Sequence, residues 1–120
     1  MARVHRHVRD GVAQALAVLD DIVPGDAQAK TKFADATAKI VKLRDDLIVA
    51  RRRGEDEDAW LERTNGIISA LFGLEFPSGG LQWKRLEDGR DALRALRDDM
   101  AAADPLDSAE AGNDGRIQSP

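Results

Sequence analysis

Apolar residues recur at alternating steps of three and four along one stretch in the first half of the chain. They are Phe33, Ala36, Ile40, Leu43, Leu47 and Ala50. This heptad spacing places every member on one face of an α-helix. Such a helix is stable when its apolar face packs against other helices, so the stretch predicts a helical bundle. We predict this helix over residues 27–53, about 40 Å long at 1.5 Å per residue, with Gly54 as the residue that ends it.

Three further segments carry apolar residues at helical spacing. They predict helices over about residues 3–23, 56–72 and 80–103. The stripe of the first ends with Val23, and that of the third ends with Phe72. Pro24 and Gly25 separate the first two helices, and the connector 74–80 separates the last two.

The order of these segments predicts the fold class. No segment alternates apolar and polar residues with the period of a β-strand. Short connections make neighbouring helices antiparallel, so we predict an all-α fold, an up-and-down bundle of about four helices over residues 1–103. Residues 104–120 are rich in Pro, Gly, Ser and acids and lack a helical period, which predicts a flexible or docked polar tail.

The composition excludes several kinds of function. Because the chain has no Cys, it has no disulfide, no thiolate catalysis and no Cys-ligated metal, and it fits a reducing compartment. The start, MARVHRHVRD, lacks the apolar run of about 7–15 residues of a secretory signal. No stretch approaches the roughly 20 apolar residues that span a membrane. We therefore expect a cytoplasmic protein, or a virion component if the chain is encoded by a phage.

The segment 51–60, RRRGEDEDAW, sets three arginines against four acids with one glycine between them. We interpret residues 51–53 as the last turn of the second helix, where cations complement the negative end of the helix dipole. We interpret residues 55–58 as the first turn of the third helix, where anions complement the positive end. The alternative interpretation is a charged docking surface.

Three aspartate pairs could in principle bind Mg²⁺, which needs several oxygens converging on one ion. The pairs are Asp20 with Asp21, Asp45 with Asp46, and Asp98 with Asp99. Each lacks a second acid one turn further along, and core residues bracket each pair, which turns the acids outward. We predict ordinary surface ion pairs instead, Lys42 with Asp46 and Arg94 with Asp98.

His5 and His7 are the only two histidines. Two residues apart on a helix, they point to different faces and cannot chelate one metal. The alternative is a frayed terminus, in which the spacing could work and the nearby Arg3, Arg6 and Arg9 could suit a phosphate. No Glu-x-x-His pair, no glycine-rich phosphate loop and no Ser or Thr with a plausible base occurs in the chain. We expect no catalytic residue, no metal and no cofactor.

Two apolar features exceed what a single small bundle needs. Ala34, Val41 and Ile48 form a second apolar line beside the heptad seam, and Leu74 and Phe76 lie in the connector beside Pro77. These five are the candidate partner-binding residues, because contiguous exposed apolar area marks an interface. Burial in the core is the default interpretation for each, and a partner surface is the alternative.

The predicted second helix is also basic, because residues 26–53 hold eight Lys or Arg and four acids. A basic helix could lie along nucleic acid through contacts to phosphates. The candidate residues are Lys32, Lys39, Lys42, Arg51 and Arg52. The acids after Gly54 would be repelled by DNA, and the whole chain carries a net charge of −4.

The sequence therefore favours a non-enzymatic protein–protein interaction or assembly module, either a homo-oligomeric subunit or an adaptor of a bacterial or phage complex. The alternative is a small nucleic-acid-associated regulator that uses the basic helix 27–53.

Overall fold

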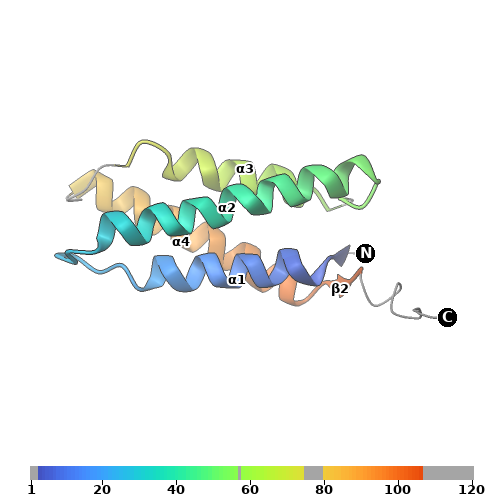
Figure 1. Cartoon of the computed structure of the whole chain (residues 1–120), viewed down its shortest axis with the longest axis horizontal. Helices are drawn as coiled ribbons and strands as arrows, with labels where there is room; N and C mark the ends of the chain where they lie inside the picture. The colour runs from blue at the N-terminus through green and yellow to red at the C-terminus, as the bar shows by residue number, and fades with distance from the viewer. Residues whose placement is uncertain (1–2, 57, 75–79, 107–120) are drawn as a thin grey trace.

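The computed structural model describes residues 3–56, 58–74 and 80–106 of the chain (Figure 1). Within them the chain forms helices and two very short strands. In order they are β1 (Arg3–Val4), α1 (Arg6–Asp20), α2 (Ala29–Arg52), α3 (Trp60–Leu71), α4 (Gly80–Ala101) and β2 (Asp104–Pro105). The predicted all-α fold is confirmed.

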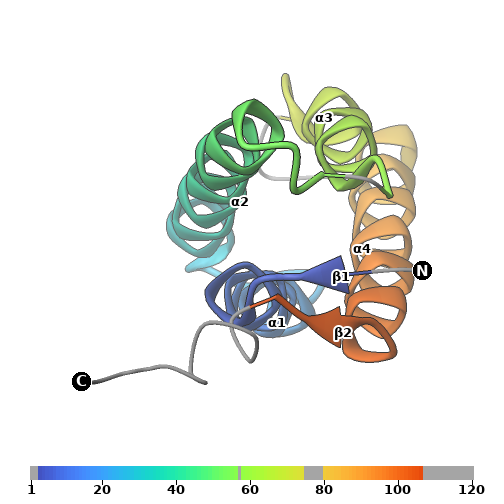
Figure 2. The ribbon, with the colours of Figure 1, turned by 90° about the vertical axis from the view of Figure 1, so that its right-hand side faces the viewer.

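The four helices of this described part form a ring, seen end-on in Figure 2. Each helix packs against the next one along the chain, and α4 packs against α1 to close the ring. The chain direction alternates from one helix to the next, as the colours of Figure 1 show. The arrangement is the up-and-down bundle expected from short connections.

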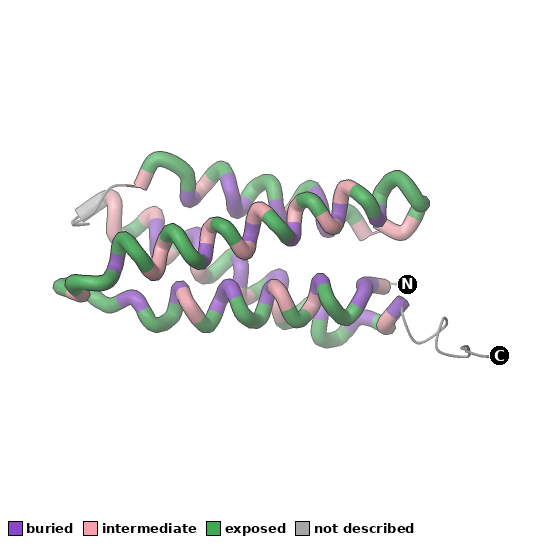
Figure 3. The backbone as a smooth tube through the Cα atoms, viewed as in Figure 1, coloured by how far each residue is buried: buried purple, intermediate pink, exposed green. Residues whose placement is uncertain are grey.

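The core lies along the axis of the ring, and the heptad seam of α2 supplies much of it. Five of its six members are buried, and Phe33 is half-buried against the core. Figure 3 shows buried positions recurring on the inner face of each helix. The largest fully buried side chains include Leu16, Ile40, Leu86 and Met100. The seam is therefore an inward face, as its spacing predicts.

Two glycines mark close approaches between helices. A Cβ at Gly89 of α4 would overlap the side chain of Leu71 on α3. A Cβ at Gly11 of α1 would lie 2.8 Å from Cδ2 of Leu43 on α2. The absence of a side chain lets both helix pairs pack closely.

Several helix ends differ from the sequence prediction. Helix α1 ends at Asp20 rather than near residue 23, and Val23 is 55% exposed. Helix α3 ends at Leu71, and Phe72 takes an extended conformation and is also 55% exposed. Both residues were expected on inward stripes, and that expectation is wrong, because the helix stops before reaching them. Gly54 has a φ of 71° just after α2, the left-handed conformation predicted for it.

The two short strands were not anticipated, because two residues are too few to show a strand period. They pair in parallel, with Arg3 beside Asp104 and Val4 beside Pro105. The N–H of Leu106 donates to the carbonyl of Val4, and both side chains are buried. The predicted tail 104–120 thus begins with a docked segment, and residues 107–120 lie outside the described residues.

Candidate interaction surface

The second apolar line of α2 is only partly open. Ala34 is exposed and Val41 is half-buried, whereas Ile48 is half-buried and packs against the core. Asp46, which lies 3.9 Å from His7 of α1, marks the side of α2 that faces α1. Ile48 lies about 200° further round the helix, on the side that faces α3. The bundle therefore uses part of this line, and Ile48 packs against the core as its default interpretation had it.

A different line of α2 lies on the side away from the heptad seam, and we call it the outward line. It consists of Asp35, Ala38, Lys42, Asp45, Val49 and Arg52. Each member follows a residue of the heptad seam by two positions, which is about 200° round the helix. All six are exposed, and Val49 is 43% exposed. The outward line repeats the three-and-four spacing of the core seam, but on the solvent side.

Sequence reasoning missed the outward line because it sought only apolar periods. Four of its six members are charged and its two apolar members are separated by charged ones, so no run of apolar residues reveals it. It could have been found by taking the residue two positions after each member of the heptad seam.

The two connector candidates have different outcomes. Leu74 is half-buried and packs against the core. Phe76 lies outside the described residues. Among the described residues beside the connector, Phe72 is an exposed aromatic side chain, because α3 ends before it.

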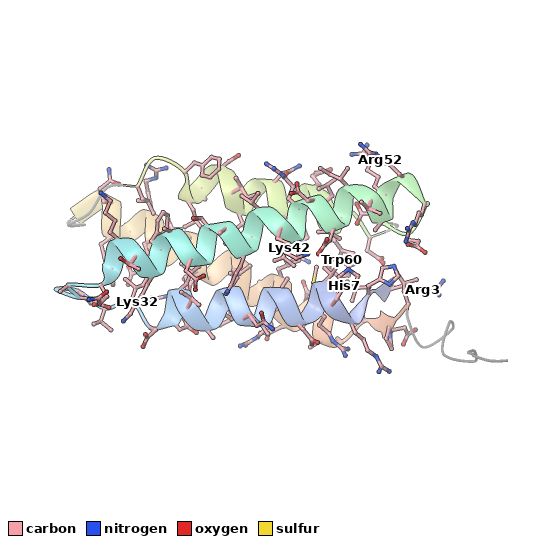
Figure 4. The ribbon with its side chains drawn as sticks, in the orientation of Figure 1. Arg3, His7, Lys32, Lys42, Arg52 and Trp60 are labelled. Atoms are coloured by element: carbon pink, nitrogen blue, oxygen red, sulfur yellow. The ribbon has the colours of Figure 1, made fainter. Side chains whose placement is uncertain are left out.

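Lys32, the basic candidate at the start of α2, is neutralised by two acids. Nζ of Lys32 lies 2.7 Å from Asp26 and 2.9 Å from Asp21, across the α1–α2 junction (Figure 4). The hydrogen bond from Lys32, with that from the backbone N–H of Gln28, lowers the pKa of Asp26. The hydrogen bonds to Asp26 and Asp21 raise the pKa of Lys32. This lysine joins two helices and is not free to meet a phosphate.

The remaining basic candidates divide into paired and unpaired groups. Lys39 pairs with Asp35 at 3.3 Å, and Lys42 pairs with Asp46 at 3.2 Å. Arg51 and Arg52 are exposed in the last turn of α2, as predicted, and Arg52 points away from the bundle in Figure 4. The structure does not bring the five candidates into one unpaired basic surface.

The acids of RRRGEDEDAW do not form the first turn of α3, so that expectation is wrong. Helix α3 begins at Trp60, and its first-turn acid is Glu62. Asp56 instead caps the helix, since its carboxylate accepts from the N–H of Trp60 at 2.8 Å. Ala59 between them has a φ of 57°, in the left-handed region. Residue 57 lies outside the described residues.

The other described acids of this loop hold the N-terminal segment. Asp58 accepts a hydrogen bond from the backbone N–H of Arg3 at 2.9 Å. The indole N–H of Trp60 donates to the carbonyl of Arg3 at 2.8 Å, and Nε2 of His5 lies 2.9 Å from Oε1 of Glu55. These contacts hold β1 against the α2–α3 loop. Asp58 and Glu55 therefore stabilise a tertiary contact, a role that the helix-end interpretation did not include.

The two histidines lie together, although they were expected to diverge. His5 precedes α1 instead of lying in it, and its ring stacks on that of His7 with centroids 5.4 Å apart. Both line a hollow of about 250 Å³ between α1 and α2, with Asp46, Arg53 and Glu55 among its other walls. No group of three or more His, Asp or Glu within the described ranges could hold a metal ion.

The aspartate pairs are engaged by cations. The closest pairings are Asp20–Arg94, Asp21–Lys32, Asp45–Arg44, Asp46–Lys42, Asp98–Arg97 and Asp99–Arg63. The predicted pair of Lys42 and Asp46 is confirmed. The predicted pair of Arg94 and Asp98 is wrong, because Arg94 reaches across to Asp20 of α1 at 2.7 Å. These carboxylates are separated among helices rather than converging on one point.

Over its described residues the chain is an all-α bundle of four helices, and the outward line of α2 is exposed. Comparison of the chain with protein-family models, with curated proteins and with solved structures found no match. Over the part of the chain that the structure describes, no helix is long and apolar enough to cross a membrane.

Proposed function

We propose that this protein is a non-enzymatic interaction or assembly module that binds a protein, either a partner or a second copy, through the outward line of α2. The observation that carries the proposal is the continuous exposure of this line on the longest helix, with Val49 near its end. The helix is 24 residues, about 36 Å, long and uses its opposite face for the core. A long helix with a second, regularly spaced surface is suited to hold another helix.

The placement of the carboxylates supports a binding role over catalysis. The two aspartates of each pair contact different cations, whereas metal-assisted chemistry needs several oxygens converging on one ion. The acids of the α2–α3 loop are used to cap α3 and to fasten β1. We place the module in the cytoplasm, or in a particle if a phage encodes it, on the ground that a chain without Cys fits a reducing compartment.

The proposal is tested with Val49→Asp, which puts a charge on the outward line without entering the core. Its matched control is Val23→Asp, because Val23 is also an exposed valine and lies outside α2. Circular dichroism checks that both variants stay helical, and light scattering measures the mass over a range of concentrations. We expect Val49→Asp alone to lose self-association, or capture of a partner if the wild type is monomeric. Equal behaviour of the two variants would remove the outward line as the binding surface.

A second candidate function is nucleic-acid binding, and one observation favours it. Arg51 and Arg52 are exposed and make no ion pair within the described residues. They are only two cations, and each of the three lysines of the same candidate set has an acid beside it that would repel a phosphate, so any such contact is expected to be weak and strongly salt-dependent.

A further inference from the structure

The charges of the outward line have an order that is complementary to its own reverse. Read from Asp35 to Arg52, the line runs acid, alanine, base, acid, valine, base. Read from the other end, it runs base, valine, acid, base, alanine, acid. Every acid in one direction therefore meets a base in the other, and every apolar residue meets an apolar residue.

Two copies of α2 would bring these complementary residues together if they packed antiparallel, with the outward line of one against the outward line of the other. With the twofold axis between Leu43 and Arg44, Asp35 of one copy lies opposite Arg52 of the other. Ala38 lies opposite Val49, and Lys42 lies opposite Asp45. The same contacts occur twice, as in any interface in which two copies use the same patch. The three-and-four spacing lets such a line follow the partner helix along its whole length.

Shifting one helix along the other by three residues would bring like charges together and make the pairing less favourable. Sliding one helix by three residues in one direction places Asp45 opposite Asp45 of the other copy at the axis. Sliding it by three residues in the other direction places Lys42 opposite Lys42. Juxtaposed like charges disfavour a pairing and help to fix its register. The residue order thus selects one of these alignments.

The charged members of the line are free to change partners. The side chains of Lys42 and Asp45 are 76% and 61% exposed, and their pairings with Asp46 and Arg44 lie within one helix at 3.2 and 3.3 Å. Exposed pairs of this kind contribute little to stability. Arg52 has no acid partner within the described residues and would gain one in the dimer.

We infer that the occupant of the outward line is a second copy of this chain, in an antiparallel α2–α2 dimer centred between Leu43 and Arg44. This inference rests on the proposed function and makes it specific. One helix pair is a small interface, so the dissociation constant is micromolar or weaker and the dimer forms in a concentration-dependent way.

The experiment reverses one charge pair and then restores it. Asp35→Arg places Arg opposite Arg52 of the second copy, and Arg52→Asp places Asp opposite Asp35. The double variant, Asp35→Arg with Arg52→Asp in one chain, restores opposite charges at both contacts. Asp88→Arg on α4 is the matched control, because Asp88 pairs with Lys84 one turn away just as Asp35 pairs with Lys39.

Sedimentation velocity on the four variants and the wild type, at concentrations up to about 1 mM, gives the dissociation constants. We expect each single reversal to weaken the dimer about tenfold or more, the double variant to recover it, and Asp88→Arg to leave it unchanged. A wild type that stays monomeric overturns this inference. The proposed function would then require a different protein as the partner, which the capture assay with Val49→Asp tests. A wild-type dimer that is indifferent to both single reversals also overturns it, and places self-association on another face.

Discussion

The same substitution, glycine to alanine, is expected to have opposite effects at two helical positions of this bundle. Gly66 lies in the middle of α3, it is exposed, and no heavy atom lies within 4 Å of the position of an added Cβ. Gly→Ala in an open helix interior gains about 0.8–1 kcal/mol of helix propensity. Gly66→Ala should therefore raise the free energy of unfolding by nearly that amount.

At Gly89 the same gain in propensity is opposed by a clash. The added methyl would overlap Leu71, and Leu71 is fully buried, so its side chain has no open space to enter. Overpacking of a dense core costs about 1–3 kcal/mol. After the propensity gain of about 1 kcal/mol, Gly89→Ala should lower the free energy of unfolding by up to about 2 kcal/mol.

Gly11 provides an intermediate case. The added methyl would lie 2.8 Å from Cδ2 of Leu43, which is the far end of a flexible side chain. A hollow of about 150 Å³ lined by both residues gives Leu43 room to move. Gly11→Ala should therefore be near neutral, because the small displacement offsets the propensity gain.

Thermal unfolding followed by circular dichroism measures all three variants. A change of 1 kcal/mol corresponds to about 3–6 °C in Tm for a domain of this size. We expect Gly66→Ala to have the highest Tm of the three variants, Gly11→Ala an intermediate Tm and Gly89→Ala the lowest. A Gly89→Ala protein at least as stable as Gly66→Ala would refute the close α3–α4 contact on which the reasoning depends.

Three further predictions concern the α1–α2 junction, the basic face and the inner flank of α2. Lys32 lowers the pKa of Asp26 in the folded protein. The ionised carboxylate therefore contributes its full stabilisation at a pH above the ordinary pKa of Asp, and this stabilisation is lost as the pH falls through the lowered pKa of the folded protein. Denaturant titrations from neutral to acidic pH should show Asp26→Asn less stable at neutral pH and converging with wild type in acid, whereas a constant difference would contradict the role of Lys32. Fluorescence anisotropy at physiological salt should give no nucleic-acid binding tighter than micromolar, and a nanomolar complex abolished by Lys39→Glu with Lys42→Glu would revive the alternative function. Ile48→Asp should lose about 2–4 kcal/mol in denaturant unfolding, because it removes apolar contact with the core and partly buries a carboxylate, and a fully stable Ile48→Asp would show that the bundle does not cover this residue.

The helices could be predicted from the sequence because their apolar residues recur with a helical period. Leu43 and Leu47 belong to a period that extends over more than four turns, and such a period specifies both the helix and its buried face. Proline and glycine then mark the junctions, as Pro24 and Gly54 do here. Packing of four amphipathic helices with short connections leaves few other arrangements.

The features that the sequence analysis missed depend on single contacts rather than on periods. Trp60 begins α3 because Asp56, four residues earlier, accepts its backbone N–H, and nothing in the charge run distinguishes Asp56 from its neighbours. The placement of His5 depends on β1 meeting a segment about a hundred residues away in the chain. The outward line was hidden because its complementarity appears only when the helix is paired with its own reverse.

Cysteine cross-linking shows whether two copies of the protein meet through the side of α2 opposite the core. The natural chain has no Cys, so Ala38→Cys and Val49→Cys each introduce a single thiol at an exposed position. In the antiparallel dimer these two positions lie opposite each other, whereas identical positions lie eleven residues, about 16 Å, apart along the helix. That separation is too long for a disulfide, whose Cα atoms lie within about 7 Å. Under mild oxidation we expect a covalent dimer when the two variants are mixed and none, or far less, from either variant alone. Cross-linking that is no greater in the mixture than in the separate variants would contradict this expectation.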